Sequence, residues 1–453
     1  MHHISFNFEI INMKKISILW VLMVLIGTSV SAQSKKWTLL ECVDYAIKNN
    51  ISIKQSELDL KVSDIEKIEA IGSFMPTLNG NASFSINTGA SINPVTNQFQ
   101  NETFKSFSAG LNSSVTIFNG LVNWKNLQRS KLSKIANTYR LDKMKDDIAL
   151  SVANSYLQIL FNKEQLKVQK NQNLVTKENL KRTQELINAG SVPAGDIFEL
   201  EATDATQQQQ IISTENTLLI SKIALCQTLL LEEYSTFDIA DAEIDVPVST
   251  VINESQDAIL AKAKEAVKDV KIAISNVELA KKDVAISRSS YLPTLSGFVG
   301  YNTRWSESPI FNFIDQLSLF DGTAVGLQLN VPIFNGFATK SRVKRAKINQ
   351  ERSEFQLKQT ELDLERNVYQ AYNDVINAKK SFEAAQKSLE ARKQAYNFTK
   401  ERYNVGLQNA FDFSQSTIAL ENAQSEVLRT KYDYIFKVKI VEFYFGIPIS
   451  QLK

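Results

Sequence analysis

The sequence is poor in histidine: its two histidines, His2 and His3, lie at the extreme N-terminus. Both precede the predicted cleavage site of an export signal, after Ala32, so we expect none in the mature chain. Histidine is the usual side chain for acid–base chemistry near neutral pH and the commonest metal ligand. The sequence also lacks any other convergent set of catalytic residues. We therefore predict that the protein is not an enzyme and has no catalytic residue, cofactor or metal site.

Cysteine is equally scarce, and Cys42 and Cys226 each stand alone in a helix-like pattern. Sequence alone cannot place two cysteines within bonding distance, so we favour two buried thiols over a disulfide. An excess of charge of one sign is missing too, because 51 basic residues nearly balance 49 acidic ones. This balance gives no basis for nucleic-acid binding.

Long hydrophobic runs are confined to the N-terminal segment. Lys14 and Lys15 precede an apolar run over 16–26 and small residues up to Ala32, which is the order of a secretory signal. We predict a signal peptide at 1–32. Its apolar run is shorter than the ~20 residues of a transmembrane helix, and no later stretch approaches ~18 uncharged apolar residues. The stretch 336–341 resembles a phosphate-binding loop only weakly, because it lacks the second glycine.

Glycine and proline are missing from a stretch of about seventy residues between Gly336 and Gly406. Apolar residues recur along it at seven-residue intervals, with one six-residue step, and such a repeat is the seam of a helix packed side by side on others. At ~1.5 Å per residue, this helix would be roughly 100 Å long. The seam consists of Ile348, Phe355, Leu362, Tyr369, Ile376, Phe382, Leu389, Tyr396 and Tyr403.

The chain contains this arrangement twice. Val115-Thr-Ile-Phe-Asn-Gly120 matches Val331-Pro-Ile-Phe-Asn-Gly336 at an offset of 331 − 115 = 216 residues. At the same offset, the first half has a corresponding seam with the six-residue step at the same place. The glycine that follows the seam is Gly190 in the first half. Self-similarity of this period indicates a tandem duplication. We predict a first repeat at 33–245 and a second at 246–453.

Each repeat is predicted to have the order helix, strand, strand, helix, helix. In the first repeat the helices are expected at 37–71, 121–189 and 196–231, and the strands at 77–89 and 106–118, with a loop at 90–105. In the second repeat the helices are expected at 255–291, 337–405 and 412–445, and the strands at 294–305 and 323–334. The stretch 232–254 reads as the link between the repeats.

The strands alternate an apolar face with one of Ser, Thr, Asn and Gln, as transmembrane barrel strands do. Their length suits a tilted strand of ~9–11 residues that crosses a membrane. Four strands cannot close a barrel, for which about eight is the minimum, so several chains are expected to share one. The alternative is a soluble β-layer packed on helices.

The export signal, the duplicated order, the Ile-Phe-Asn-Gly before each long helix and the Asn-x-Gly at its end together resemble the TolC family of outer membrane efflux proteins. The resemblance covers the whole mature chain. It implies a mainly α fold with a transmembrane β-barrel: a homotrimer with twelve strands in one barrel and a long α-helical tunnel through the periplasm. The helix tips would close the far end of that tunnel.

The two turns between long and short helices are the candidate site. They run from Gly190 to Asp196 and from Gly406 to Asp412. Glycine ends a helix readily because it tolerates positive φ. Asp196 with Glu199, and Asp412 with Gln415, fit a helix start in which the first side chain caps backbone amides and the later one reaches back.

The family resemblance adds a gating role to these tips. Tyr403 matches the tyrosine of the family's periplasmic gate, although it also continues the seam and fits simple packing. Asp196 matches the aspartate of the charged lock, whereas Gln408 stands where the family has arginine. Asp412 matches the first aspartate of the cation-selecting ring, but Gln415 replaces the second. The resemblance thus implies a weaker acidic ring unless Glu199 compensates. Phe411 and Phe413 fit either an apolar constriction or tip packing, and we favour packing.

The leading hypothesis is a channel in the outer membrane of a Gram-negative cell that exports small molecules passively. The expected partners are outer membrane lipid, a periplasmic adaptor and an inner-membrane pump of the resistance–nodulation–division (RND) type. An alternative within the same architecture is the exit duct of a type I protein secretion system, driven by an ABC exporter. A different class, a periplasmic coiled-coil adaptor or structural protein, fits the helices but not the alternating strands.

Overall fold

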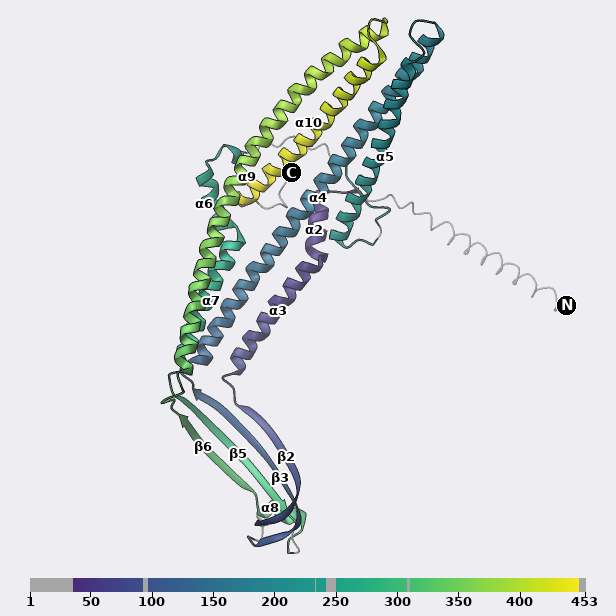
Figure 1. The fold of residues 1–453 in the computed structure, drawn as a ribbon. Helices are drawn as coiled ribbons and strands as arrows, with labels where there is room; N and C mark the ends of the chain where they lie inside the picture. Colours follow the sequence, from purple (N-terminus) through teal and green to yellow (C-terminus); the bar gives the residue numbers. More distant parts are fainter. Residues whose placement is uncertain (1–35, 93–96, 233, 242–249, 308–309, 448–453) are drawn as a thin grey trace, which may run out of the picture. The chain divides into compact units, whose positions relative to one another are not determined.

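The computed structural model describes residues 36–92, 97–232, 234–241, 250–307 and 310–447, which form two compact units (Figure 1). Unit 1 comprises the described parts of 1–46, 152–245 and 389–428, and unit 2 the described parts of 47–151, 246–388 and 429–453. The predicted signal peptide at 1–32 and the predicted boundary between the repeats at 245/246 lie outside the described residues.

Unit 2 contains a four-stranded antiparallel sheet in the order β2-β3-β5-β6. The strands are β2 (Thr77–Ile92), β3 (Phe99–Phe118), β5 (Thr294–Ser306) and β6 (Gly322–Asn330). Each repeat therefore contributes one hairpin, and β3 of the first pairs with β5 of the second, with Phe107 opposite Trp305.

The two faces of the sheet differ in polarity. Side chains opposite one another on neighbouring strands share a face, because the side-chain period of a strand is two. One face is apolar and exposed, with Leu327 at 70% and Val325 at 75% exposure. The other carries hydroxyl and amide pairs, such as Ser83 with Ser108 at 2.8 Å between their oxygens.

The strand ends depart from the sequence-based boundaries. The predicted loop at 90–105 is largely wrong, because β2 continues to Ile92 and β3 starts at Phe99. Polar residues extend this ladder by cross-strand bonds, for example between the Thr88 and Thr103 hydroxyls at 3.0 Å. In the second hairpin β6 ends at Asn330 rather than at 334. Pro332, which cannot donate a ladder hydrogen bond, lies two residues farther on.

The second hairpin also contains a helix that the sequence did not indicate. Helix α8 (Phe313–Leu319) lies between β5 and β6, and Asn312 begins it by accepting a hydrogen bond from the Asp315 amide at 2.8 Å. It lies at the end of the sheet away from the long helices (Figure 1). A helix of 7 residues is too short for its periodicity to be recognised in the sequence.

The helix before each hairpin is broken, whereas the sequence predicted it to be continuous. The first consists of α2 (Leu39–Asn49) and α3 (Ile51–Gly72), and the second of α6 (Gln256–Ala266) and α7 (Lys268–Ser289). The break rests on one residue with extended ψ, 134° at Asn50 and 129° at Val267. Because the apolar periodicity continues on both sides of the break, the sequence pattern does not reveal a change in a single dihedral angle.

The long helices α4 (Val122–Asn188) and α9 (Ala338–Asn404) are each 67 residues. The seam of α9 changes character along its length. Ile348, Phe355 and Leu362 are 59%, 66% and 52% exposed, whereas Tyr396 and Tyr403 are buried. None of the helices within the described residues has the length and apolarity needed to cross a membrane.

In unit 1 the ends of α4 and α9 pack with α5 (Asp196–Leu229) and α10 (Ala410–Phe445). The predicted link at 232–254 is not wholly irregular. Its strand β4 (Asp238–Ile239) pairs in parallel with β1 (Lys36–Trp37), and a 3-10 turn covers Thr250–Asn253. Cys42 and Cys226 are fully buried thiols.

Candidate functional site

The two helix tips end their long helices in the same way. The φ angles of Gly190 and Gly406 are +69° and +76°, in the left-handed region that favours glycine. At the first tip the Gly190 amide donates to the Ile187 carbonyl at 2.9 Å and the Ser191 amide to the Leu186 carbonyl at 2.9 Å. This pair of bonds satisfies carbonyls that the helix end would leave free.

At the second tip the same two bonds recur. The Gly406 amide donates to the Tyr403 carbonyl at 3.1 Å, and the Leu407 amide donates to the Arg402 carbonyl at 2.9 Å. Open space surrounds both glycines, since an added Cβ would meet nothing within 4 Å. Their requirement for glycine is therefore conformational and does not come from packing.

The following helices begin differently, and the capping roles predicted for two aspartates are wrong. Helix α10 starts at Ala410, and Asn409 is its cap, accepting a hydrogen bond from the Asp412 amide at 2.8 Å. Asp412 thus lies inside the first turn, where its carboxylate accepts from the Gln408 amide at 2.6 Å. Gln415 is exposed on the following turn.

Asp196 is the first residue of α5, preceded by Gly195, which offers no side-chain cap. Asp196 and Glu199 both lie in the first turn and are half-buried. Negative charges there interact favourably with the partial positive charge of a helix N-terminus. This interaction, rather than a capping hydrogen bond, is their local contribution.

Tyr403 is the central side chain of the tip region. It is 3% exposed, and its hydroxyl oxygen lies 2.8 Å from that of Thr183 on α4. Its ring stacks on Phe413 of α10 with centroids 4.7 Å apart and planes 5° apart. Burial raises the pKa of Tyr403 above its ordinary value, and nearby Asp196 adds to this. Tyr403 is a neutral hydrogen-bonding group that joins three helices.

The cluster around Tyr403 is aromatic and aliphatic. Phe413 also stacks on Tyr396, with centroids 5.9 Å apart, and is itself 1% exposed. Leu200, Ala410 and Leu420 complete the buried cluster. The interpretation of Phe413 as packing fits this position, whereas Phe411 is 56% exposed and packs little.

Beyond this cluster, α5 and α4 contact α10 through small polar groups. The hydroxyl oxygens of Thr203 and Ser414 lie 2.8 Å apart. Farther along, Gln207 donates to the Glu421 carboxylate at 3.2 Å, and Gln165 donates to the Ser425 hydroxyl at 2.7 Å. Burial raises the pKa of Glu421, which the hydrogen bond from Gln207 partly offsets. We call these three contacts the polar ladder.

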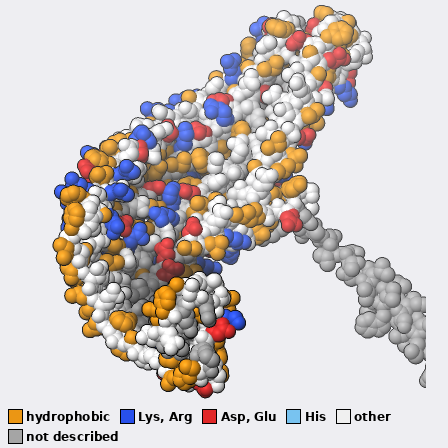
Figure 2. Space-filling view, turned by 60° about the horizontal axis from the view of Figure 1, so that its bottom comes forward, with side chains coloured by type: hydrophobic (Ala, Val, Ile, Leu, Met, Phe, Trp, Pro, Cys, Tyr) orange, Lys and Arg blue, Asp and Glu red, His pale blue; other side chains and the backbone are white. Residues whose placement is uncertain are grey.

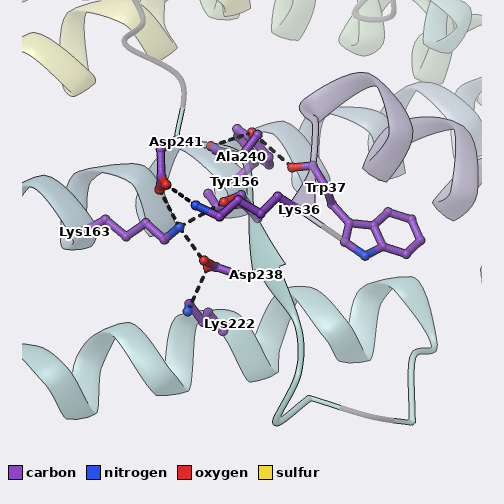
Figure 3. A network of polar contacts seen from close by, with 9 residues as sticks. Lys36, Trp37, Tyr156, Lys163, Lys222, Asp238, Ala240 and Asp241 are labelled. Atoms are coloured by element: carbon purple, nitrogen blue, oxygen red, sulfur yellow. Dashed lines mark hydrogen bonds and ion pairs between the residues drawn. The ribbon is translucent and has the colours of Figure 1, made fainter. Parts of the chain in front are cut away.

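A second polar cluster holds the β1–β4 pair (Figure 3). The Lys163 ammonium lies 2.8 Å from both Asp238 and Asp241, and Lys222 lies 2.9 Å from Asp238. Lys36 forms an ion pair with Asp241. We call these five residues the charged clasp.

Titration of the clasp carboxyls reflects these contacts. Hydrogen bonds from Lys163 and Lys36 lower the pKa of Asp241 to about 2. Burial by itself would raise the pKa of Asp238, but hydrogen bonds from Lys163 and Lys222 outweigh it and lower the pKa. Sequence analysis missed the clasp because its members come from four separate stretches with no shared motif.

The structure brings some of the predicted tip residues together and leaves others apart. Gln408 contacts Asp412, and Asp196 lies close enough to Tyr403 to influence its pKa. Thr183 was missed, although the offset of 216 pairs it with Thr399, a signal that could have marked both positions. Ser414, which contacts Thr203, carried no such signal.

Comparison with known proteins gives a consistent result. The family model described as outer membrane efflux protein matches residues 42–229 and 259–438. The proteases secretion protein PrtF of Dickeya chrysanthemi is 23% identical over 354 residues, 76% of this chain and 73% of PrtF. The outer membrane protein TolC of Salmonella enteritidis is 23% identical over 343 residues, 73% of this chain and 66% of TolC. The crystal structure of the outer membrane protein VceC from Vibrio cholerae aligns with a TM-score of 0.74 at 15% identity, over 90% of this chain and 96% of that one.

Proposed function

Because the chain belongs to the outer membrane efflux protein family, we propose that it is the exit duct of a tripartite system that exports small molecules. The protein is an outer membrane channel of a Gram-negative cell. A channel in this position conducts passively, and the energy comes from an inner-membrane pump joined by a periplasmic adaptor. We propose a pump of the RND type. We also propose a signal peptide at 1–32 and repeats at 33–245 and 246–453.

The observation that best supports this proposal is the difference in polarity between the two faces of the sheet. Its exposed apolar face suits lipid and its hydroxyl- and amide-rich face suits water, as in barrels that enclose an aqueous channel. Hydrophobic side chains gather over the strand end of the molecule, whereas charged side chains gather over the helices (Figure 2). Four strands leave two edges, at β2 and β6, which a bilayer would not tolerate. Three copies, joined edge to edge, supply twelve strands and remove every edge.

The exposed helix seams support the same assembly. Ile348, Phe355 and Leu362 occupy heptad positions of α9, yet each is more than half exposed in the single chain. Helix α3 likewise exposes Leu58 and Ile65 at 57% and 56%. Heptad positions are buried when neighbouring helices pack on them. We propose that neighbouring copies cover these seams in a homotrimer, forming a tunnel through the periplasm.

Tyr403 is proposed as a latch of the periplasmic gate. It holds α9 to α4 by one hydrogen bond and to α10 by one ring stack. The polar ladder beside it consists of groups that water can satisfy equally well, so separation of the helices costs less than opening an apolar core. Partners that bind the open tips better than the closed ones would shift the equilibrium towards opening.

Crosslinking in intact cells, followed by purification of this protein and mass spectrometry, tests the proposal directly. An RND pump with its adaptor among the crosslinked partners supports the proposed function. Recovery of an ABC exporter instead favours protein secretion, the second candidate, for which the similarity to PrtF over 76% of this chain is the specific observation. A protein that is monomeric in mild detergent contradicts the shared barrel.

The acidic ring is tested separately by conductance. The exposed carboxylate of Asp412 is proposed to select cations, with Glu199 contributing in place of the absent second aspartate at Gln415. We expect Asp412→Ala to lower cation selectivity and cation block in planar bilayers, and Glu199→Ala to lower them less. Gln415→Asp is the matched gain-of-charge variant and is expected to raise both. An unchanged Asp412→Ala pore contradicts this role.

A further inference from the structure

Helix α8 is held firmly against the end of the sheet. The Gln316 side chain is fully buried and uses both ends of its amide: its oxygen accepts from the Ser306 amide at 2.9 Å, and its nitrogen donates to the Ser306 carbonyl at 2.9 Å. The Thr303 hydroxyl donates to the Leu317 carbonyl at 2.7 Å. A buried amide whose oxygen and nitrogen are both hydrogen-bonded fixes the orientation of the helix that carries it.

The helix lies on the apolar face of the sheet. Phe313 packs against Phe107 and Trp305, with ring centroids 5.6 Å and 5.4 Å apart. These two residues oppose each other in the register of β3 and β5, and Trp305 shares its face with Val299, which opposes Val325. Helix α8 therefore continues the exposed apolar face and does not cover the hydroxyl-rich one.

Large apolar side chains remain exposed on and beside α8. Ile314 is 70% exposed, Ile310 just before the helix 69%, and Leu319 56%. The helix has one charged residue, the exposed Asp315. Apolar groups at a membrane boundary are stabilised by acyl chains, while a nearby charge can remain in the headgroup layer. Aromatic residues such as Trp305 and Phe313 are enriched at this depth.

We infer that α8 is an interfacial anchor, in which Ile310 and Ile314 contact lipid acyl chains at the rim of the outer leaflet. The inference rests on the proposed function, because it requires the apolar sheet face to be in the bilayer. Continuity between that face and the exposed side chains of α8 identifies the occupant as lipid. A neighbouring copy of the chain, an external protein or water are the other candidates.

The test places an environment-sensitive fluorophore on single introduced cysteines, in the full-length protein reconstituted into phospholipid vesicles. The native thiols need no removal, because Cys42 and Cys226 are fully buried. Burial also raises the pKa of Cys226 to about 11, which keeps it unreactive. The unsubstituted protein, treated with the same reagent, measures any background labelling.

Four positions are compared. Ile314→Cys reports on α8, and Leu319→Cys repeats the measurement if that variant fails to fold. Leu327→Cys lies on the apolar face of β6 and reports whether the sheet is in the bilayer. Gln328→Cys lies on the opposite face of the same strand. The quenchers are aqueous iodide and lipids that carry a nitroxide either close to the headgroup or at mid-chain.

The label at Ile314 should lose most of its fluorescence to the nitroxide near the headgroup and little to iodide. Quenching of Leu327 by the mid-chain nitroxide, combined with quenching of Ile314 by iodide alone, overturns the anchor while leaving the membrane-spanning sheet intact. Protection of Ile314 from both kinds of quencher also overturns it and identifies a protein neighbour. Exposure of Leu327 to iodide alone instead contradicts the proposed function.

Discussion

The tip region and the charged clasp belong to the same unit but are held by different chemistry. The tips rest on hydroxyl and amide contacts around one aromatic stack, including Tyr403–Thr183 and Thr203–Ser414. The clasp rests on ion pairs among Lys163, Asp238 and Asp241. A hydrogen bond between neutral groups contributes only about 0.5–1.5 kcal/mol net, whereas one to a charged group contributes about 1.5–3 kcal/mol. The Lys163–Asp238 pair is also largely buried, with side chains 17% and 26% exposed. The contrast agrees with the proposal that the tip opens, and it predicts that the clasp stays closed.

Removing the aromatic latch should have the largest effect. Tyr403→Ala deletes a buried ring, which typically costs about 3–5 kcal/mol. Its counterpart in the first repeat, Ile187, is only half-buried, so Ile187→Ala should cost about 1 kcal/mol. Hydrogen exchange at both tips measures the difference, and single-channel recording should show more frequent opening for Tyr403→Ala. Equal effects of the two variants would remove the special role of Tyr403.

Breaking the clasp should come next. Lys163→Gln leaves Asp238 without its nearest cation, at a cost of about 1.5–3 kcal/mol for a hydrogen bond to a charged group. The amide of Ala240, which donates to the Trp37 carbonyl at 2.8 Å, should then exchange faster. Lys170→Gln is the control, because the Lys170–Glu215 pair is about half exposed and should contribute little. Unchanged exchange at Ala240 would contradict the clasp.

Replacing the tip glycines should cost less and equally in the two repeats. Gly190→Ala and Gly406→Ala each place a Cβ on a residue with positive φ, a penalty of about 1–2 kcal/mol. Neither creates a clash, so a similar loss of protection in the last turns of α4 and α9 is expected. A much larger loss at one glycine would mean that packing, rather than φ, selects it.

The unequal helix starts provide a smaller test. Asn409→Ala removes the side-chain cap of α10 and should cost about 0.5–2 kcal/mol. Asp196→Ala removes only a charge from the first turn of α5, worth about 0.3–1 kcal/mol. Amide exchange of Asp412 and of Glu199 reports the two ends separately. If Asp196→Ala accelerated amide exchange more than Asn409→Ala does, Asp196 would have to act as a cap, contrary to the structure.

Acid should change the stability of the charged clasp and of the polar ladder in opposite directions. The pKa of Asp241 is lowered to about 2, so its stabilising effect is present above the ordinary value near 3.8 and is lost as the pH falls through about 2. The pKa of Glu421 is raised, so the folded state favours its protonated form. The stability that this form contributes is fully present below the ordinary pKa near 4.5 and is lost as the pH rises through the folded-state pKa.

Mild acid towards pH 4.5 should therefore strengthen the contacts of the polar ladder, and stronger acid should loosen the clasp. Hydrogen exchange across a pH series, after correction for intrinsic rates, measures both trends. Glu421→Gln should abolish the trend at the ladder and leave the one at the clasp unchanged. A Glu421→Gln protein that keeps the full ladder trend would contradict the assignment.

Sequence reasoning predicted the features that repeat over many residues. The heptad seam of α9, the alternation of β6 and the glycines that end the long helices all follow from local chemistry. Sequence reasoning failed where the local structure depends on a single residue or on a partner far away in the sequence. The break at Asn50, the helix around Gln316 and the clasp at Lys163 depend on a single ψ angle, a buried amide or residues far apart in sequence. Tyr403 was identified by its position, but its contact with Thr183, 220 residues away, was not, because the repeat pairs Thr183 with Thr399 and does not say which residue it touches.

The equal length of α4 and α9, 67 residues each, limits how this chain can change over evolutionary time. Inserting one residue into either helix would rotate everything beyond it by about 100°, turning its seam away from its neighbours. Insertions of a whole heptad restore the seam but displace one tip by roughly 10 Å relative to the other. The lengths of the long helices should therefore vary among homologues by matched insertions in both repeats. Such insertions should fall at equivalent positions of the two repeats and so keep the internal duplication recognisable.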